Sequence, residues 1–130
     1  LEVSLTYLEA TGVDVFAPAI GNAHGAYKRS PNLDFNRISN LVAAHPIPIA
    51  LHGGSGLSDE QFRDCIARGC AKVNISTALK DTYCQASLAA LEKARDKGKY
   101  EPLTVFGDVV PAVRALVVQF ATTFGSAGKA

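Results

Sequence analysis

The chain has 130 residues, of which 48% are hydrophobic and 19% charged, and its 13 Lys and Arg residues nearly balance 12 Asp and Glu residues. This length and apolar fraction suit one domain of ordinary size with a sizeable core. The near-zero net charge argues against nucleic-acid and membrane partners, because such proteins usually carry a basic surplus or stripe. No uninterrupted apolar run approaches the roughly 18 residues of a membrane-spanning helix.

The sulfur-containing residues add two expectations. Three cysteines without a CxxC pair argue against a disulfide framework and favour a reducing, cytoplasmic location. The chain contains no Met and begins with Leu1. Because translation starts with Met, we expect the chain to be part of a longer protein.

Helix-like and strand-like stretches alternate from the start of the chain, as in βα units around a parallel sheet. Residues 3–11 are typical of the end of a helix, which Gly12 would terminate in a left-handed conformation. Residues 13–20 form a nearly continuous apolar run, typical of a strand buried on both faces. The polar loop over residues 21–32 is long enough to indicate a functional segment.

The alternation continues to the last helix. The predicted elements are a helix over 34–44, a strand over 47–51, a helix that begins with a capping box at Ser58 and Gln61 and ends at Gly69, a strand over 71–75, a helix from 77 into the charged stretch 92–99, and a helix over 109–120.

A (β/α)₈ barrel needs at least about 200 residues. A free-standing sheet of three strands would leave two exposed edges. We therefore predict an α/β chain that supplies only the C-terminal part of a barrel.

Each predicted strand runs into a polar turn that contains Gly or Thr. The three turns are residues 21–25 (GNAHG), 52–56 (HGGSG) and 74–77 (NIST). The carboxyl ends of parallel strands form the ligand-binding face of such folds. Two histidines and several glycines are therefore expected to meet on that face.

The second of these turns favours an anion site. Gly53, Gly54 and Gly56 would let backbone N–H groups turn towards a phosphate. Ser55 adds a hydroxyl, and Thr77 lies at the electropositive start of a helix. In isolation, the glycines are equally consistent with a tight turn before a capped helix. The neighbouring turn shifts the balance towards phosphate.

The two histidines suggest a metal site. His24 and His52 follow successive predicted strands, which would bring them close enough to share a metal ion. A catalytic zinc site usually has three protein ligands, so two histidines that are merely hydrogen-bonded in loops are the alternative. His45, before Pro46 at the opposite end of a strand, is expected to be a surface loop residue.

Together these motifs resemble the class II, metal-dependent ketose-bisphosphate aldolases, which include fructose- and tagatose-bisphosphate aldolases. The matching runs are residues 19–25 (AIGNAHG), 51–56 (LHGGSG), 72–77 (KVNIST) and 124–130 (FGSAGKA). The resemblance implies that residues 1–130 are the C-terminal portion of a single (β/α)₈ TIM-barrel domain. They would carry about strands six to eight with their helices, and the N-terminal half would be absent.

The resemblance also implies a site and a reaction. Residues that match His24 and His52 bind the catalytic Zn²⁺ in this family. Those that hold the phosphate and hydroxyl groups of dihydroxyacetone phosphate match Gly25, Gly53, Gly54, Ser55, Asn74, Ile75, Ser76 and Thr77. The metal would polarise the ketone and stabilise the enediolate left when a ketose bisphosphate is cleaved to dihydroxyacetone phosphate and glyceraldehyde 3-phosphate. Backbone carbonyls around Gly25 and Gly53 would hold a monovalent cation.

The chain departs from the family pattern in two ways. The third metal-binding His and the Asp that transfers the proton belong to an early strand absent here, so the isolated chain is expected to be inactive. Ser76 occupies a position that is acidic in some members, so the member of the family is left open, and the substrate is fructose bisphosphate, tagatose bisphosphate or another phosphorylated ketose. The resemblance further implies a homo-oligomer, to which the last two helices would contribute apolar surface.

Two other functions are consistent with the same residues. Lys72 shares strand parity with Asn74, and a desolvated Lys72 would allow a Schiff-base aldolase. The chain would instead be a non-catalytic phosphate-binding or interaction module if His24 and His52 were structural.

Overall fold

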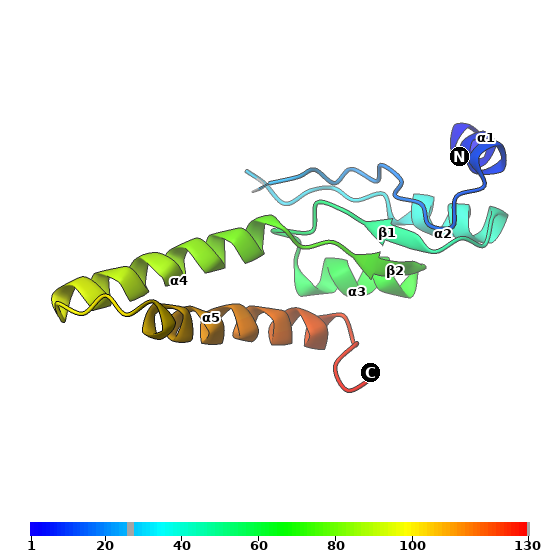
Figure 1. Cartoon of the computed structure of the whole chain (residues 1–130). Helices are drawn as coiled ribbons and strands as arrows, with labels where there is room; N and C mark the ends of the chain where they lie inside the picture. The colour runs from blue at the N-terminus through cyan, green and yellow to red at the C-terminus, as the bar shows by residue number, and fades with distance from the viewer. Residues whose placement is uncertain (26–27, 130) are drawn as a thin grey trace. The chain divides into compact units, whose positions relative to one another are not determined.

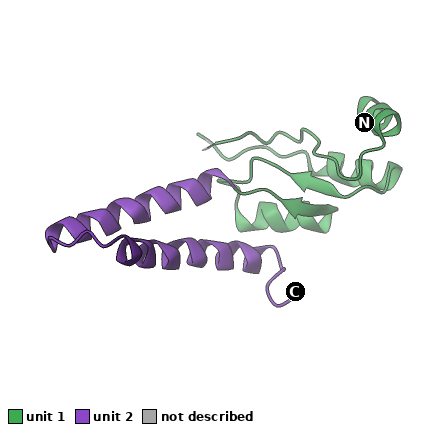
Figure 2. Cartoon of the chain, viewed as in Figure 1, with its two compact units in different colours: residues 1–75 green, residues 76–130 purple. Residues whose placement is uncertain are grey.

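The described residues, 1–25 and 28–129, form two units in a computed structural model of the chain, Leu1–Ile75 and Ser76–Ala130 (Figure 2). The first unit contains three helices and two strands, and the second contains two long helices. Their bounds are α1 (Glu2–Thr11), α2 (Phe35–Ala44), β1 (Ile49–Leu51), α3 (Asp59–Ala67), β2 (Cys70–Val73), α4 (Thr77–Asp96) and α5 (Pro102–Thr123) (Figure 1).

The centre of the first unit is a βαβ arrangement. β1 and β2 pair in parallel, with Leu51 opposite Val73, and α3 connects them (Figure 1). All three residues of β1 are buried, as expected for a strand covered on both faces. α3 packs against β2, and α2 packs against α3 and α1. The strands predicted over 47–51 and 71–75 are therefore present, although both are shorter than predicted.

The strand predicted over residues 13–20 was wrong in extent. Only one parallel bridge forms there, between Phe16 and Ile49. The Phe16 amide donates to the Pro48 carbonyl at 3.1 Å, and the Ala50 amide donates to the Phe16 carbonyl at 2.8 Å. Pro18 has no amide hydrogen, so the ladder cannot continue through it. The segment still runs beside β1 in the predicted direction.

The helix ends in this unit follow the predicted capping chemistry. Gly12 ends α1 in a left-handed conformation, with φ 60°. The Ser58 hydroxyl accepts from the Gln61 amide at 3.2 Å, and the Gln61 side chain accepts from the Ser58 amide at 3.0 Å. The predicted capping box at α3 is therefore confirmed. Gln61 also donates to the Pro31 carbonyl at 3.2 Å, which holds the polar loop against α3.

The core of the first unit is apolar and includes two thiols. The largest fully buried side chains are Leu8, Ile20, Ile38, Leu41, Ile49, Leu51, Phe62 and Cys65. Cys70 is also buried, and its hydrogen bond with Cys65, together with desolvation, raises the pKa of the Cys70 thiol. The same hydrogen bond lowers the pKa of Cys65.

The second unit is a pair of helices, α4 and α5, that pack along each other. α5 starts at Pro102, well before the predicted residue 109. Proline is favoured at the first position of a helix, because the amide hydrogen that it lacks would have no partner within the helix there. Lys93 and Asp108 join the two helices through an ion pair of 2.6 Å. Pro111 lies inside α5 and does not end it.

α5 is also the most apolar long helix of the described residues. It has 22 residues, and its mean hydropathy is 1.5 over an 18-residue window. By length and composition alone, the helix could cross a membrane. Only 6% of that window is buried. A single helix of this kind is weak support for a membrane segment, and Asp108 and Arg114 interrupt its apolar sequence.

Phe62 offers a direct test of the βαβ core. Its side chain is 1% exposed, and Phe62→Ala is expected to lower the free energy of unfolding by about 3–5 kcal/mol because it leaves a cavity beneath the sheet. Urea denaturation followed by circular dichroism measures the loss. Phe106→Ala is the matched control, since Phe106 is 56% exposed and its removal should cost less than about 1 kcal/mol. Equal losses in both variants would contradict this description of the core.

Candidate functional site

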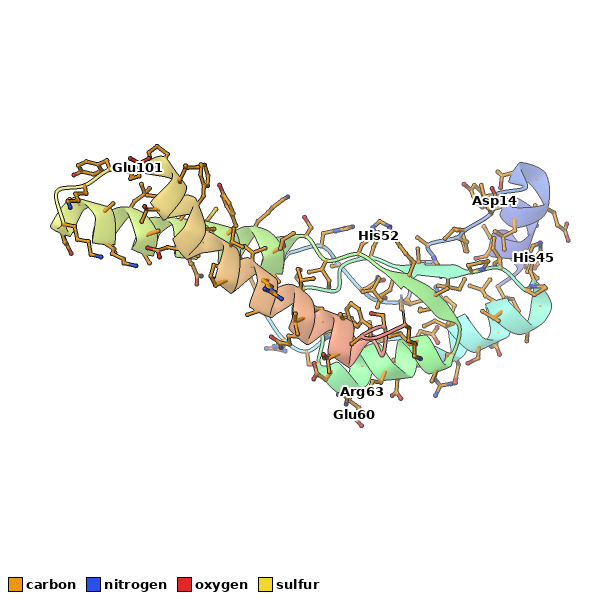
Figure 3. The ribbon with its side chains drawn as sticks, turned by 60° about the horizontal axis from the view of Figure 1, so that its bottom comes forward. Asp14, His45, His52, Glu60, Arg63 and Glu101 are labelled. Carbon is orange, nitrogen blue, oxygen red and sulfur yellow. The ribbon has the colours of Figure 1, made fainter. Side chains whose placement is uncertain are left out.

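His24 and His52 lie together at one edge of the first unit. Their ring centroids are 5.6 Å apart, and the rings meet edge to face at 71°. His52 directly follows β1, and His24 lies in the turn after the extended segment that carries Phe16. In Figure 3, His52 lies near the carboxyl end of β1, whereas His45 lies at the opposite end of the unit. The structure thus brings together the two histidines predicted to share a metal.

The turns that carry these histidines approach each other very closely. Gly53 adopts φ +63°, and a Cβ at this position would lie 2.3 Å from the Ala23 carbonyl oxygen. The Asn22 side chain donates to the His52 carbonyl at 2.6 Å. A glycine at position 53 is therefore required both by its backbone conformation and by the neighbouring turn.

Asn74 connects the end of β2 to the same histidine. Its Nδ2 lies 2.7 Å from His52 Nε2 and 3.3 Å from Nδ1. On the other side, the Lys72 ammonium donates to Asn74 Oδ1. Because an ammonium can only donate, Asn74 must turn its oxygen to Lys72 and its amide hydrogens to His52. Lys72 itself is exposed, which does not provide the desolvation that a Schiff-base lysine needs.

The glycine-rich turn after His52 is buried and firmly packed. Gly53, Gly54 and Ser55 are all buried. A Cβ at Gly54 would lie 3.0 Å from the Phe62 ring and 3.1 Å from Ile75 Cδ1, so this glycine permits close packing of the turn on α3 and β2. Gly25 is half-buried with φ +96°. The turn therefore has a packing role, whether or not it also holds a phosphate.

Ser76 and Thr77 belong to the second unit. Thr77 is the first residue of α4, as predicted, and Ser76 precedes it without a side-chain capping hydrogen bond. The N-terminus of a helix is electropositive, which suits an anion in principle.

A cleft of about 310 Å³ opens at the histidine edge, and His24, His52, Asn22 and Gly53 contribute to its walls. Among residues 1–25 and 28–129, no group of three or more His, Cys, Asp or Glu side chains could hold a metal ion. Imidazole nitrogen is a good zinc ligand, and the two rings are close enough to contribute two ligands of a tetrahedral site. The described residues therefore fit part of a metal site.

Asn22 was not among the predicted site residues. Its side chain joins the two histidine turns across 30 positions of the chain. The available signal was its place in the predicted turn over residues 21–25, two residues before His24.

The fold and the site together define a class of protein: a parallel βα barrel portion with two histidines at the carboxyl ends of neighbouring segments. The chain belongs to the class II fructose-bisphosphate aldolase family, because residues 2–129 match the family model described as Fructose-bisphosphate aldolase class-II. The predicted family and fold class, the C-terminal part of a (β/α)₈ barrel, are confirmed.

Individual relatives support the same assignment. The chain is 36% identical over 123 residues to a fructose-bisphosphate aldolase of Geobacillus stearothermophilus, covering 95% of this chain and 42% of the relative. The YdjI aldolase from Escherichia coli, known from a crystal structure, has 38% sequence identity to this chain. The two structures superpose with a TM-score of 0.80 over 96% of this chain and 45% of the YdjI chain. A fructose-bisphosphate aldolase from Campylobacter jejuni shares the fold, with a TM-score of 0.72 at 19% identity over 96% of this chain and 44% of that one. The chain thus spans less than half the length of these relatives.

The close approach at Gly53 can be tested by a single methyl group. Gly53→Ala should lower the free energy of unfolding by about 1–3 kcal/mol and shift the NMR amide signals of Ala23 and His24, because the turn must move away and the backbone is strained. Gly107→Ala is the control. It adds a methyl group with no heavy atom within 4 Å in the middle of α5, and should raise stability by about 0.5–1 kcal/mol. Unchanged Ala23 and His24 signals in Gly53→Ala would argue against the contact.

Proposed function

We propose that this chain provides two metal-binding histidines and part of the phosphate-binding surface of a zinc-dependent ketose-bisphosphate aldolase. The reaction is the reversible cleavage of fructose or tagatose 1,6-bisphosphate to dihydroxyacetone phosphate and glyceraldehyde 3-phosphate. The observation that carries the proposal is the edge-to-face pairing of His24 and His52 at a centroid distance of 5.6 Å. Membership of the class II aldolase family supports it.

In this proposal each group of residues has a distinct task. His24 and His52 hold Zn²⁺, which when bound would supply Lewis-acid polarisation of the substrate ketone. Asn74 Nδ2 lies 2.7 Å from Nε2 of the metal-free His52 ring, and this hydrogen bond would break on metal binding, because the ring nitrogen that does not bind the metal carries a hydrogen. The residues that bind the phosphate and hydroxyl groups of dihydroxyacetone phosphate are Gly25, Gly53, Gly54, Ser55, Asn74, Ile75, Ser76 and Thr77.

The remaining parts of the site would come from outside these 130 residues. A third histidine ligand and a proton-transferring Asp are assigned to the portion of the relatives that the chain does not span, so we propose that the chain alone is inactive. The carbonyls around Gly25 and Gly53 would hold a monovalent cation. A homo-oligomer in the cytoplasm completes the proposal, and exposed apolar residues of α5 such as Phe106 and Val110 suit such contacts.

A phosphate-binding or interaction module without catalysis is the second candidate. It is favoured by the packing of Gly54 against Phe62 and Ile75, which accounts for the glycine-rich turn without a ligand. A Schiff-base aldolase is less well supported, because Lys72 is exposed and donates to Asn74.

Zinc binding separates the first two candidates. Titration of the chain with Zn²⁺, followed by calorimetry, should reveal one site, and His24→Ala or His52→Ala should weaken its affinity at least tenfold because each removes one of two ligands. His45→Ala is the matched control and should bind as the wild type does, since His45 lies at the opposite end of the unit (Figure 3). Equal zinc affinity in all four proteins would favour the module.

Aldolase activity requires a complete barrel. A chimera that joins the N-terminal portion of the Geobacillus stearothermophilus aldolase to this chain should cleave fructose 1,6-bisphosphate in a coupled assay. A chelator should abolish that activity, and added Zn²⁺ should restore it. The same chimera with His24→Ala and His52→Ala should lose at least 100-fold in kcat, because the metal would lack two ligands. Activity that resists the chelator in a folded chimera would contradict the metal mechanism.

A further inference from the structure

The Asn22 side chain is hydrogen-bonded at both ends, and its two partners lie on different segments. Its Oδ1 accepts from the Ile20 amide at 3.2 Å, and its Nδ2 donates to the His52 carbonyl at 2.6 Å. The first bond turns the side chain back along its own segment. The second crosses to the residue that follows β1. Asn22 is half-buried at this point, in the wall of the histidine cleft.

The orientation of this amide follows from its partners. A backbone N–H can only donate and a backbone carbonyl can only accept, so the side-chain oxygen must face Ile20 and the nitrogen must face His52. No other common side chain of this length offers one acceptor and one donor in that arrangement. Asp keeps the acceptor but places a carboxylate against the His52 carbonyl, and Leu keeps the volume but removes both bonds.

The position of this bond explains why it is needed. The parallel bridge between Phe16 and Ile49 lies several residues before the histidines, and Pro18 interrupts the ladder in between. The Asn22 bond joins the two segments again close to the histidines, where regular pairing has ended. Because His24 is two residues beyond Asn22, the bond restricts the distance between the two turns that carry the rings.

We propose that Asn22 is a positioning residue that holds His24 and His52 at the spacing of a shared metal ion before any metal binds. Its link to metal rests on the proposed function, whereas its effect on the two rings does not. Ligands that are already in place lose less conformational entropy when the metal arrives. Outer partners that orient metal ligands typically change metal affinity by 10–100-fold when they are removed.

The test measures ring proximity and metal affinity separately. In the wild type, we expect NMR to show nuclear Overhauser effects between the ring protons of His24 and His52, whose ring centroids are 5.6 Å apart. In Asn22→Ala these effects should weaken or disappear, and the Kd for Zn²⁺ should rise about 10–100-fold. Asn36→Ala is the matched control, because Asn36 is exposed on α2, and it should match the wild type in both measurements.

A second variant, Asn22→Asp, distinguishes the loss of the hydrogen bond to His52 from a general loss of folding. It retains the acceptor for Ile20, loses the donor to His52 and places a carboxylate against the His52 carbonyl, so the ring effects should be lost while the circular dichroism spectrum stays that of the wild type. Zinc affinity is not compared for this variant, since a new negative charge would itself attract the cation.

The possible outcomes are distinct. Retained ring effects in Asn22→Ala and Asn22→Asp would overturn the proposal, as would an unchanged Kd for Zn²⁺ in a protein whose ring effects are lost. If the wild type binds no Zn²⁺ but its ring effects still depend on Asn22, the positioning role stands and the proposed metal function falls.

Discussion

The histidine edge depends on one parallel contact, the bridge between Phe16 and Ile49. Because the bridge is parallel, the segment that contains Phe16 and the strand β1 both run towards the same edge of the sheet. The residues that follow each of them must then meet there. With an antiparallel bridge, the turns that carry His24 and His52 would lie at opposite ends of the sheet, and no shared site could form.

The close spacing of this edge has consequences for side-chain size. The Ala23 carbonyl approaches Gly53 so closely that a methyl group there would overlap it. On the other side of the turn, Gly54 fits against Phe62 and Ile75. Two consecutive glycines thus serve different purposes, the first for the neighbouring turn and the second for the helix beneath. A phosphate bound at this turn would make use of a backbone that is already held in place by packing.

The sequence allowed the local features to be predicted better than the pairing. The capping box at Ser58 and the helix end at Gly12 depend only on residues a few positions apart, and both were predicted correctly. The extent of the segment around Phe16 depends on hydrogen bonds with a distant strand, and apolar composition does not reveal how far such a ladder continues. The Asn22 bond requires knowledge of the register between segments 30 positions apart, which no local pattern contains.

The end of β2 links the metal and substrate parts of the proposed site through one side chain. Asn74 contacts the His52 ring, yet it also opens the turn proposed to bind the hydroxyl and phosphate groups. Since Lys72 occupies the oxygen of this amide, its hydrogens remain directed at the ring. The amide has two hydrogens, and one of them is directed at His52 Nε2. In the proposed site, the orientation of the His52 ring and the binding of substrate would be coupled through Asn74.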